Sequence, residues 1–192
     1  MTRKFLSFAL ASVLDCGIAL GAESNYTTEG KEKVTRNGEV DSPLKEKIRN
    51  GEFDKSLERM KKAYEENKNN EATKAAAPPI SAVYILQVCS SDAGGCEYIN
   101  EGQTSTNLNH GGSTFYVITG VRGYGGRNTD SATFAGNQAT MIDCKDAANN
   151  NVVYGWYEQW DVSKPSNTNG TFTYTARSIN VGPTMSTSIY IK

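Results

Sequence analysis

Short apolar runs alternate with clusters of turn-forming residues from Ile80 to the end of the sequence. The runs are AVYILQVC, STFYVITGV, QATMIDC, NVVYGWYEQWDV, GTFTYTARSI and TSIYIK. The clusters SSDAGG, GYGGRNTD, KDAANNN and KPSNTNG, which separate them, consist of residues that favour turns. Six or seven short strands predict an all-β fold, a small antiparallel β-sandwich, with a β-barrel as the alternative. We place this domain at residues 78–192, because Pro78 and Pro79 cannot continue a helix.

Residues 23–77, which precede the β-rich part, have few large apolar side chains and many charges. Twelve acidic and twelve basic residues balance one another in this segment. Ser42 as N-cap, Pro43 at the first helical position and the pair Asn50-Gly51 as a terminator predict a short helix.

A second helix is predicted from Asp54 to about Asn67, where Leu57, Met60 and Tyr64 recur at helical spacing. This apolar stripe is narrow, and such a segment buries too little surface to fold alone. We therefore expect a charged helical linker, a pro-segment or a weakly docked pair of helices. The fragment 76–192 is expected to fold without it.

Residues 1–22 have the pattern of a secretory signal peptide, with basic residues, an apolar run and then small residues. The expected cleavage follows Gly21 or Ala22. The apolar run is too short to span a membrane, and Asp15 before Cys16 disfavours a lipid anchor. The sequence thus predicts a secreted protein, extracellular or periplasmic, without a membrane span.

Three cysteines would remain after cleavage. Cys89 and Cys96 flank the turn SSDAGG, which favours a disulfide between them in an oxidising compartment. Cys144 is then expected to be a small buried side chain. Spacing does not fix the connectivity, so a pairing of Cys144 with either of the others is the rival.

Both tryptophans of the chain lie in the aromatic stretch VVYGWYEQW. Strand alternation would place on one face the residues Val152, Tyr154, Trp156, Glu158 and Trp160. The first interpretation is a core strand, because large aromatic side chains dominate cores. The second is a ligand-binding platform of Trp156, Glu158 and Trp160, since a carboxylate is costly in a dry core. We expect a mixed strand, with Trp156 in the core and Trp160 near the rim.

Catalytic and metal-binding patterns are scarce. The only histidine, His110, has no partner at metal-ligand spacing, so we expect no metal and no cofactor. A Cys144–His110 dyad is conceivable, but a loop histidine and a buried cysteine are the simpler interpretation. The near-neutral β-rich part has no basic stripe, which argues against nucleic acid as a partner.

Several stretches together carry a family resemblance. They are AAPPISAVYILQVCSS, NHGGSTFYVITGVRGYG, GWYEQWD and TMSTSIYI. This combination resembles the YolA-like secreted bacterial domain, a family of unknown function, over roughly residues 76–192. The resemblance implies a small exported β-rich domain, but no known reaction, cofactor or catalytic residue that could be assigned to this chain.

Two functions follow as alternatives. The first is a secreted binding module for carbohydrate or for a cell-surface protein. The second is a secreted hydrolase or toxin with an N-terminal pro-segment. The lack of a recognisable nucleophile and base favours the first, so we lean against an enzyme.

Overall fold

The computed structural model describes residues 42–70, 78–125, 129–163, 169–179 and 182–192, with side chains of the first segment described to residue 66. The expected signal peptide, residues 1–22, and the start of the charged segment lie outside the described residues. The elements are α1 (Pro43–Arg49), α2 (Asp54–Asn70), β1 (Ala82–Ser90), β2 (Gly95–Tyr98), β3 (Phe115–Arg122), β4 (Ser131–Phe134), β5 (Asn137–Gln138), β6 (Thr140–Asn149), β7 (Val152–Asp161), β8 (Gly170–Arg177) and β9 (Thr184–Ile191).

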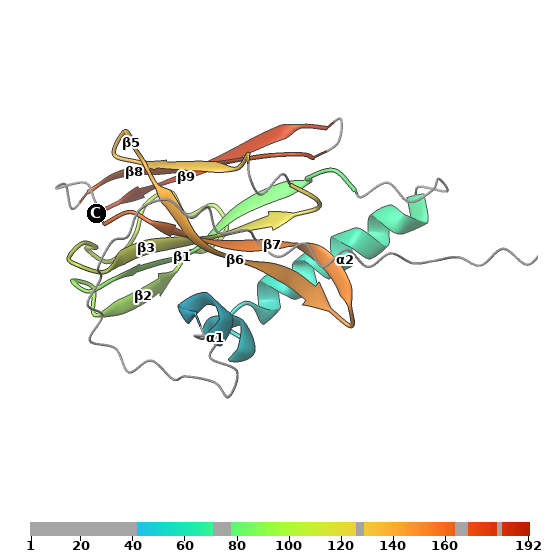
Figure 1. The fold of residues 1–192 in the computed structure, drawn as a ribbon, viewed down its shortest axis with the longest axis horizontal. Helices are drawn as coiled ribbons and strands as arrows, with labels where there is room; N and C mark the ends of the chain where they lie inside the picture. Colours follow the sequence, from blue (N-terminus) through green and yellow to red (C-terminus); the bar gives the residue numbers. More distant parts are fainter. Residues whose placement is uncertain (1–41, 71–77, 126–128, 164–168, 180–181) are drawn as a thin grey trace, which may run out of the picture.

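The strands form two antiparallel sheets that lie face to face (Figure 1). One sheet has five strands in the order β2-β1-β3-β7-β6, and the other has four in the order β5-β4-β8-β9. The prediction of an all-β sandwich is confirmed, and the described strands do not close into a barrel.

The main core lies between the two sheets. Alternate residues of β8 face it, namely Phe172, Tyr174 and Ala176, and all three are fully buried. They pack with side chains of the five-stranded sheet that include Val117, Val121, Trp156 and Trp160. The period-2 pattern of the sequence therefore positions this core.

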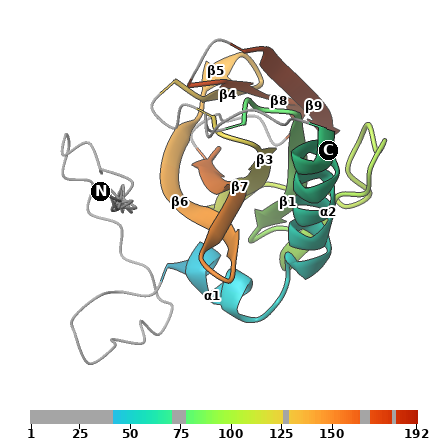
Figure 2. The ribbon, with the colours of Figure 1, turned by 90° about the vertical axis from the view of Figure 1, so that its right-hand side faces the viewer.

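Both described helices pack on the outer face of the five-stranded sheet (Figure 2). Leu44, Phe53 and Met60 are buried there against a second apolar cluster that includes Ile118 and Tyr157. The described helices are therefore docked on the β-domain, an arrangement that suits a linker and a pro-segment alike. No helix among the described residues is long and apolar enough to cross a membrane.

The helix ends follow the sequence pattern. The Ser42 hydroxyl accepts a hydrogen bond from the Lys45 backbone N–H at 3.1 Å, so the predicted N-cap is confirmed. Between the helices, the Glu52 carboxylate accepts hydrogen bonds at 2.9 Å from Lys47, Gln87 and Tyr98. Burial raises the pKa of Glu52, but these hydrogen bonds outweigh it and place the pKa below its usual value. Glu52 thus ties the helices to β1 and β2.

A test of helix docking is the substitution Met60→Ala. Because Met60 is fully buried against the sheet, emptying the site should lower the free energy of unfolding by about 2–5 kcal/mol. Lys55→Ala, at an exposed position of the same helix, is the control and should change it by less than about 0.5 kcal/mol. Chemical denaturation would measure both, and equal small effects would show that α2 contributes no packing.

Candidate ligand-binding site

The aromatic strand β7 lies inside the five-stranded sheet, between β3 and β6. Trp156 is 8 % exposed, Trp160 is 2 % exposed and Glu158 is fully buried. The expectation that Trp160 lies near the rim is therefore wrong. None of the three side chains offers a surface on which a ligand could stack in this structure, so the site must be sought elsewhere.

A β-bulge breaks the alternation that the sequence pattern assumed for β7. Ala147 and Ala148 of β6 pair with Gly155 and Val153, so Tyr154 has no partner across this ladder. Tyr154 consequently turns away from Trp156 and packs under the helices, with its ring edge-on to Tyr64 at 5.3 Å. From Tyr154 to Trp160, neither face of β7 is left for solvent.

Glu158 keeps its place in the core because polar groups surround it. The Tyr174 hydroxyl donates to an Asp130 carboxylate oxygen at 3.4 Å, and Glu158 interacts electrostatically with Tyr174. The Trp160 indole N–H donates to the Thr119 hydroxyl at 2.9 Å in the same region. Burial raises the pKa of Asp130 and that of Tyr174. Glu158 and Tyr174 are both fully buried, so these polar groups lie inside the core and do not face a ligand.

The predicted disulfide between Cys89 and Cys96 is confirmed. The two residues are directly opposite in the β1–β2 hairpin, with Cα atoms 4.0 Å apart. Cys144 is buried on β6 and takes no part in the bridge. Since side chains alternate along a strand, the neighbours Ser90 and Glu97 leave the hairpin on the face opposite the sulfur atoms.

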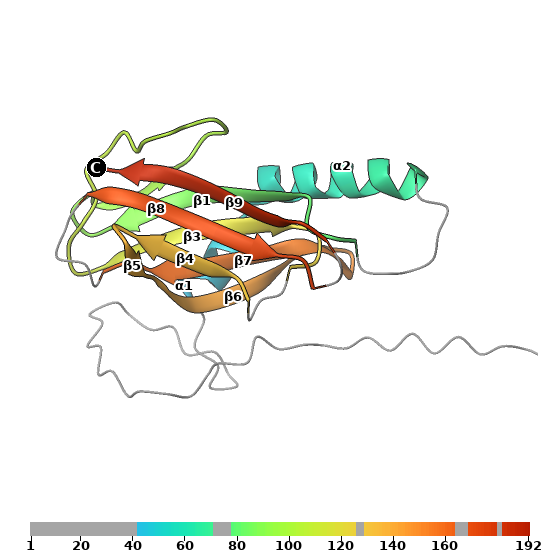
Figure 3. The same cartoon turned by 90° about the horizontal axis from the view of Figure 1, so that it is seen from above.

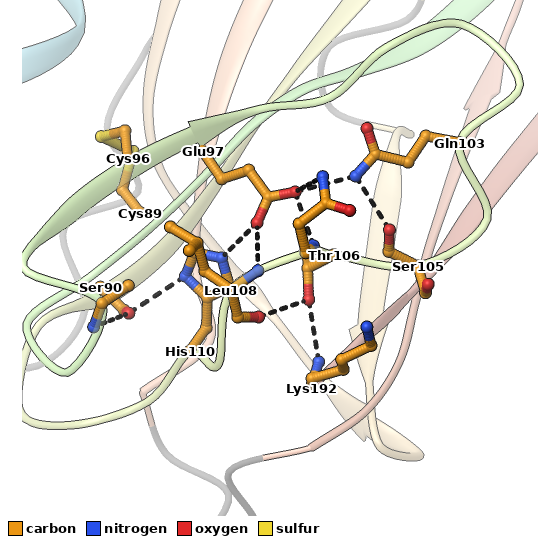
Figure 4. Close-up of polar contacts among 12 residues, drawn as sticks. Cys89, Ser90, Cys96, Glu97, Gln103, Ser105, Thr106, Leu108, His110 and Lys192 are labelled. Carbon is orange, nitrogen blue, oxygen red and sulfur yellow. Dashed lines mark hydrogen bonds and ion pairs between the residues drawn. A yellow bond between two sulfur atoms is a disulfide. The ribbon is translucent and has the colours of Figure 1, made fainter.

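Ser90, Glu97 and the predicted loop residue His110 meet on that face (Figure 4). The Ser90 hydroxyl lies 3.1 Å from His110 Nδ1, and a Glu97 carboxylate oxygen lies 3.3 Å from His110 Nε2. The imidazole is 1 % exposed and stacks on the Phe115 ring, with centroids 6.4 Å apart. His110 is thus held on three sides.

The Glu97 carboxylate also organises the connection between β2 and β3. It accepts hydrogen bonds at 2.8 Å from the backbone N–H groups of Asn107 and Leu108 and from the Gln103 side chain. Burial raises the pKa of Glu97, but the two backbone hydrogen bonds lead the contributions that outweigh it, and the pKa lies below its usual value. The carboxylate is therefore ionised at neutral pH and serves as an anchor for this loop.

Serine, histidine and an acid in contact invite comparison with a hydrolytic triad. A nucleophile must reach its substrate, but Ser90 is buried, does not line the adjacent pocket, and accepts a hydrogen bond from the Ala93 N–H at 3.2 Å. The trio is structural. Cys144 and His110 do not form a dyad either. His110 contacts Glu97 of β2, whereas Cys144 lies on β6, and these two strands are the opposite edges of the five-stranded sheet.

A pocket of about 410 Å³ opens beside His110. Its lining comes from three separate parts of the chain, namely Asp92, Asn109, His110, Asn169, Tyr190 and Lys192. Tyr190 is 44 % exposed. The backbone around the pocket is held by hydrogen bonds from the His110 N–H to the Lys192 carbonyl at 2.6 Å and from the Thr106 N–H to the Tyr190 carbonyl at 2.9 Å.

Sequence reasoning missed this pocket because its residues are far apart along the chain. The available signal was the Gly111-Gly112 pair after His110. Gly112 has φ +92°, and a Cβ atom there would lie 2.1 Å from the Ser91 hydroxyl oxygen. The glycine lets the loop pass close to the β1–β2 turn. Within the described residues, no group of three or more His, Cys, Asp or Glu side chains could hold a metal ion.

The fold and the pocket define a two-sheet antiparallel β-sandwich with a concave polar site at one end. The family described as a domain of unknown function (DUF4879) matches residues 73–191, and the chain belongs to this family. No curated protein matches the chain. The match begins after α2, so the helices lie outside the family domain.

Burial of both tryptophans leads to a test that differs from the sequence expectation. Trp156→Ala and Trp160→Ala should each lower the free energy of unfolding by about 3–5 kcal/mol, the range for emptying a large aromatic site. Acrylamide should quench the tryptophan fluorescence of the folded wild type only weakly. Ile179→Ala, at an exposed position, should be nearly neutral. Strong quenching would contradict the buried placement.

The lowered pKa of Glu97 makes a prediction about acid stability. A carboxylate with a depressed pKa contributes stability above its unfolded-state pKa, about 4.5, and this contribution is lost as the pH falls through the folded-state value. Glu97→Gln should unfold more easily at pH 7 and lose this acid dependence. Glu101→Gln, exposed in the same loop, should retain it. Thermal melts from pH 7 to pH 3 would separate the two variants, and parallel curves would refute the anchor role.

Proposed function

We propose that this protein is an exported, non-catalytic module that binds a neutral carbohydrate in the pocket beside His110. The observation that carries the proposal is the lining, in which a half-exposed tyrosine ring stands beside carboxylate and amide side chains. Small-ligand sites commonly combine apolar surface with a few placed polar groups.

The side chains around the pocket suit the chemistry of a sugar. Each sugar hydroxyl both donates and accepts hydrogen bonds. Asp92 supplies acceptors, whereas Asn109 and Asn169 supply donors and acceptors. The Tyr190 ring offers an apolar face for the C–H groups of a pyranose. Asp92 and Lys192 carry opposite charges, which favours a neutral ligand over a highly charged one.

Rigidity supports binding at this position. The Cys89–Cys96 disulfide, the Glu97 anchor and the enclosed imidazole hold the wall of the pocket before any ligand arrives. A preformed site spends less free energy on ordering when it binds. The alternative of a hydrolase or toxin lacks such support, since Ser90 does not line the pocket.

Export forms part of the proposal. The disulfide suits an oxidising compartment, and the signal-like pattern of residues 1–22 points the same way. We propose an extracellular or periplasmic location for the protein. We also propose that it is related to the YolA-like secreted bacterial domains that its sequence resembles. A cell-surface protein as partner is the competing outcome.

The test begins with a glycan array probed with the wild-type protein, followed by calorimetry on a bound oligosaccharide. Tyr190→Ala and Asn109→Ala should each weaken the affinity about tenfold, a loss of about 1.4 kcal/mol. Asn137→Ala, an exposed asparagine on β5, is the matched control and should bind as the wild type does. Absence of glycan binding, or equal affinity of all variants, would overturn the proposal.

A further inference from the structure

The outer face of the four-stranded sheet carries an ordered set of hydroxyl groups. Figure 3 looks onto this sheet. The core-facing residues of β8 alternate with Thr171, Thr173 and Thr175, which point outward. On β9 the outward side chains are Thr184, Ser186, Ser188 and Tyr190, all four exposed.

Pairing between the strands aligns these hydroxyls into rows. Thr173 lies opposite Thr133 of β4 on one side and opposite Ser188 of β9 on the other. Thr175 lies likewise between Ser131 and Ser186, and its hydroxyl is 2.8 Å from that of Ser186. Two parallel rows therefore cross three strands.

The rows keep a regular spacing because the register is continuous. Pairings of β8 with β4 and β9 show no shift, whereas β1–β3 and β6–β7 each contain irregularities. In such a sheet, hydroxyls repeat at about 4.8 Å across strands and about 6.6 Å along them. Such a regular array of hydroxyl groups suits a partner whose own hydrogen-bonding groups repeat at regular intervals.

The face is also nearly uncharged and uncovered by the described helices. Both helices pack on the other sheet. Arg177, at the end of β8, is the one charged side chain that the register places among these outward positions. A polyanion would require more cations, so the face suits a neutral polymer.

A protein partner fits this face less well. Protein interfaces depend on buried aromatic and arginine anchors, and Ser and Thr are under-represented among them. Addition of a foreign strand at the edge is restricted too. The β9 edge residue Tyr190 already exchanges hydrogen bonds with Thr104 and Thr106, through its N–H and its carbonyl respectively.

We propose that this hydroxyl face, defined by Ser131, Thr133, Thr173, Thr175, Ser186 and Ser188, binds the surface of an insoluble neutral polysaccharide with extended chains. The inference rests on the proposed function, because it names the physical form of the carbohydrate. Tyr190 joins the two regions, since it lines the pocket and lies opposite Thr171 on the same sheet. A chain lying along the face can reach the pocket at its end.

The test is sedimentation of the full chain with microcrystalline cellulose and with α-chitin. A row variant combines Thr133→Val, Thr173→Val and Ser188→Ala, which removes three hydroxyls while preserving strand-compatible shapes. Thr140→Val, an exposed threonine on the other sheet, is the matched control. Circular dichroism and melting curves would verify that each variant folds.

The wild type and the control should sediment with at least one of the two solids, and the row variant should show at least a fivefold lower bound fraction. The row variant should still bind soluble oligosaccharide. Sedimentation of the row variant at the wild-type level, or of no protein with either solid, would overturn the inference. If Asn109→Ala no longer binds soluble oligosaccharide but still sediments with the solid polysaccharide, the pocket and the hydroxyl face are supported as two separate sites. Sedimentation that depends on the rows without any soluble binding would instead refute the pocket alone.

Discussion

The hydrogen bonds accepted by the Glu97 carboxylate are the interaction on which the candidate site depends. The loop that follows β2 has little ladder pairing of its own, so its backbone N–H groups need other acceptors. One carboxylate accepts from two of them and also contacts the His110 imidazole. The disulfide holds that carboxylate in place from the opposite face of the hairpin. An otherwise irregular segment can thereby form a stable pocket wall.

The two sheets of the sandwich have different roles. The five-stranded sheet is covered on both faces, by the other sheet and by the helices, and its bulges adapt it to two apolar clusters. The four-stranded sheet has one covered face and a regular register. The five-stranded sheet contains bulges because its strands must direct apolar side chains to a separate core on each face. The four-stranded sheet has one solvated face, so its strands can keep a simple alternation.

Local patterns predicted a large part of the fold. Apolar runs predicted six of the nine described strands and missed the short strands β2, β4 and β5. Ser42 and Asn50-Gly51 predicted the limits of α1, and a short turn predicted the disulfide. Prediction failed where distant contacts decide the outcome. Alternation alone could not show that a bulge turns Tyr154 away or that Thr119 gives the Trp160 indole a buried partner. The pocket was hidden for the same reason, since Asn109, Asn169 and Tyr190 meet only in the folded chain.

Because both helices pack against the same sheet, the molecule has two different sides. The four-stranded sheet, whose outer side is the hydroxyl face, and the two helices lie on opposite sides of the five-stranded sheet (Figure 1). A molecule adsorbed through the hydroxyl face would therefore present α1 and α2 to the surrounding medium. A population bound to one fibre would share this orientation and coat it with a layer of Lys and Glu side chains. Adsorption would then replace the hydroxyl surface of the fibre with a layer dense in charges of both signs that nearly balance, which alters how the fibre interacts with its neighbours.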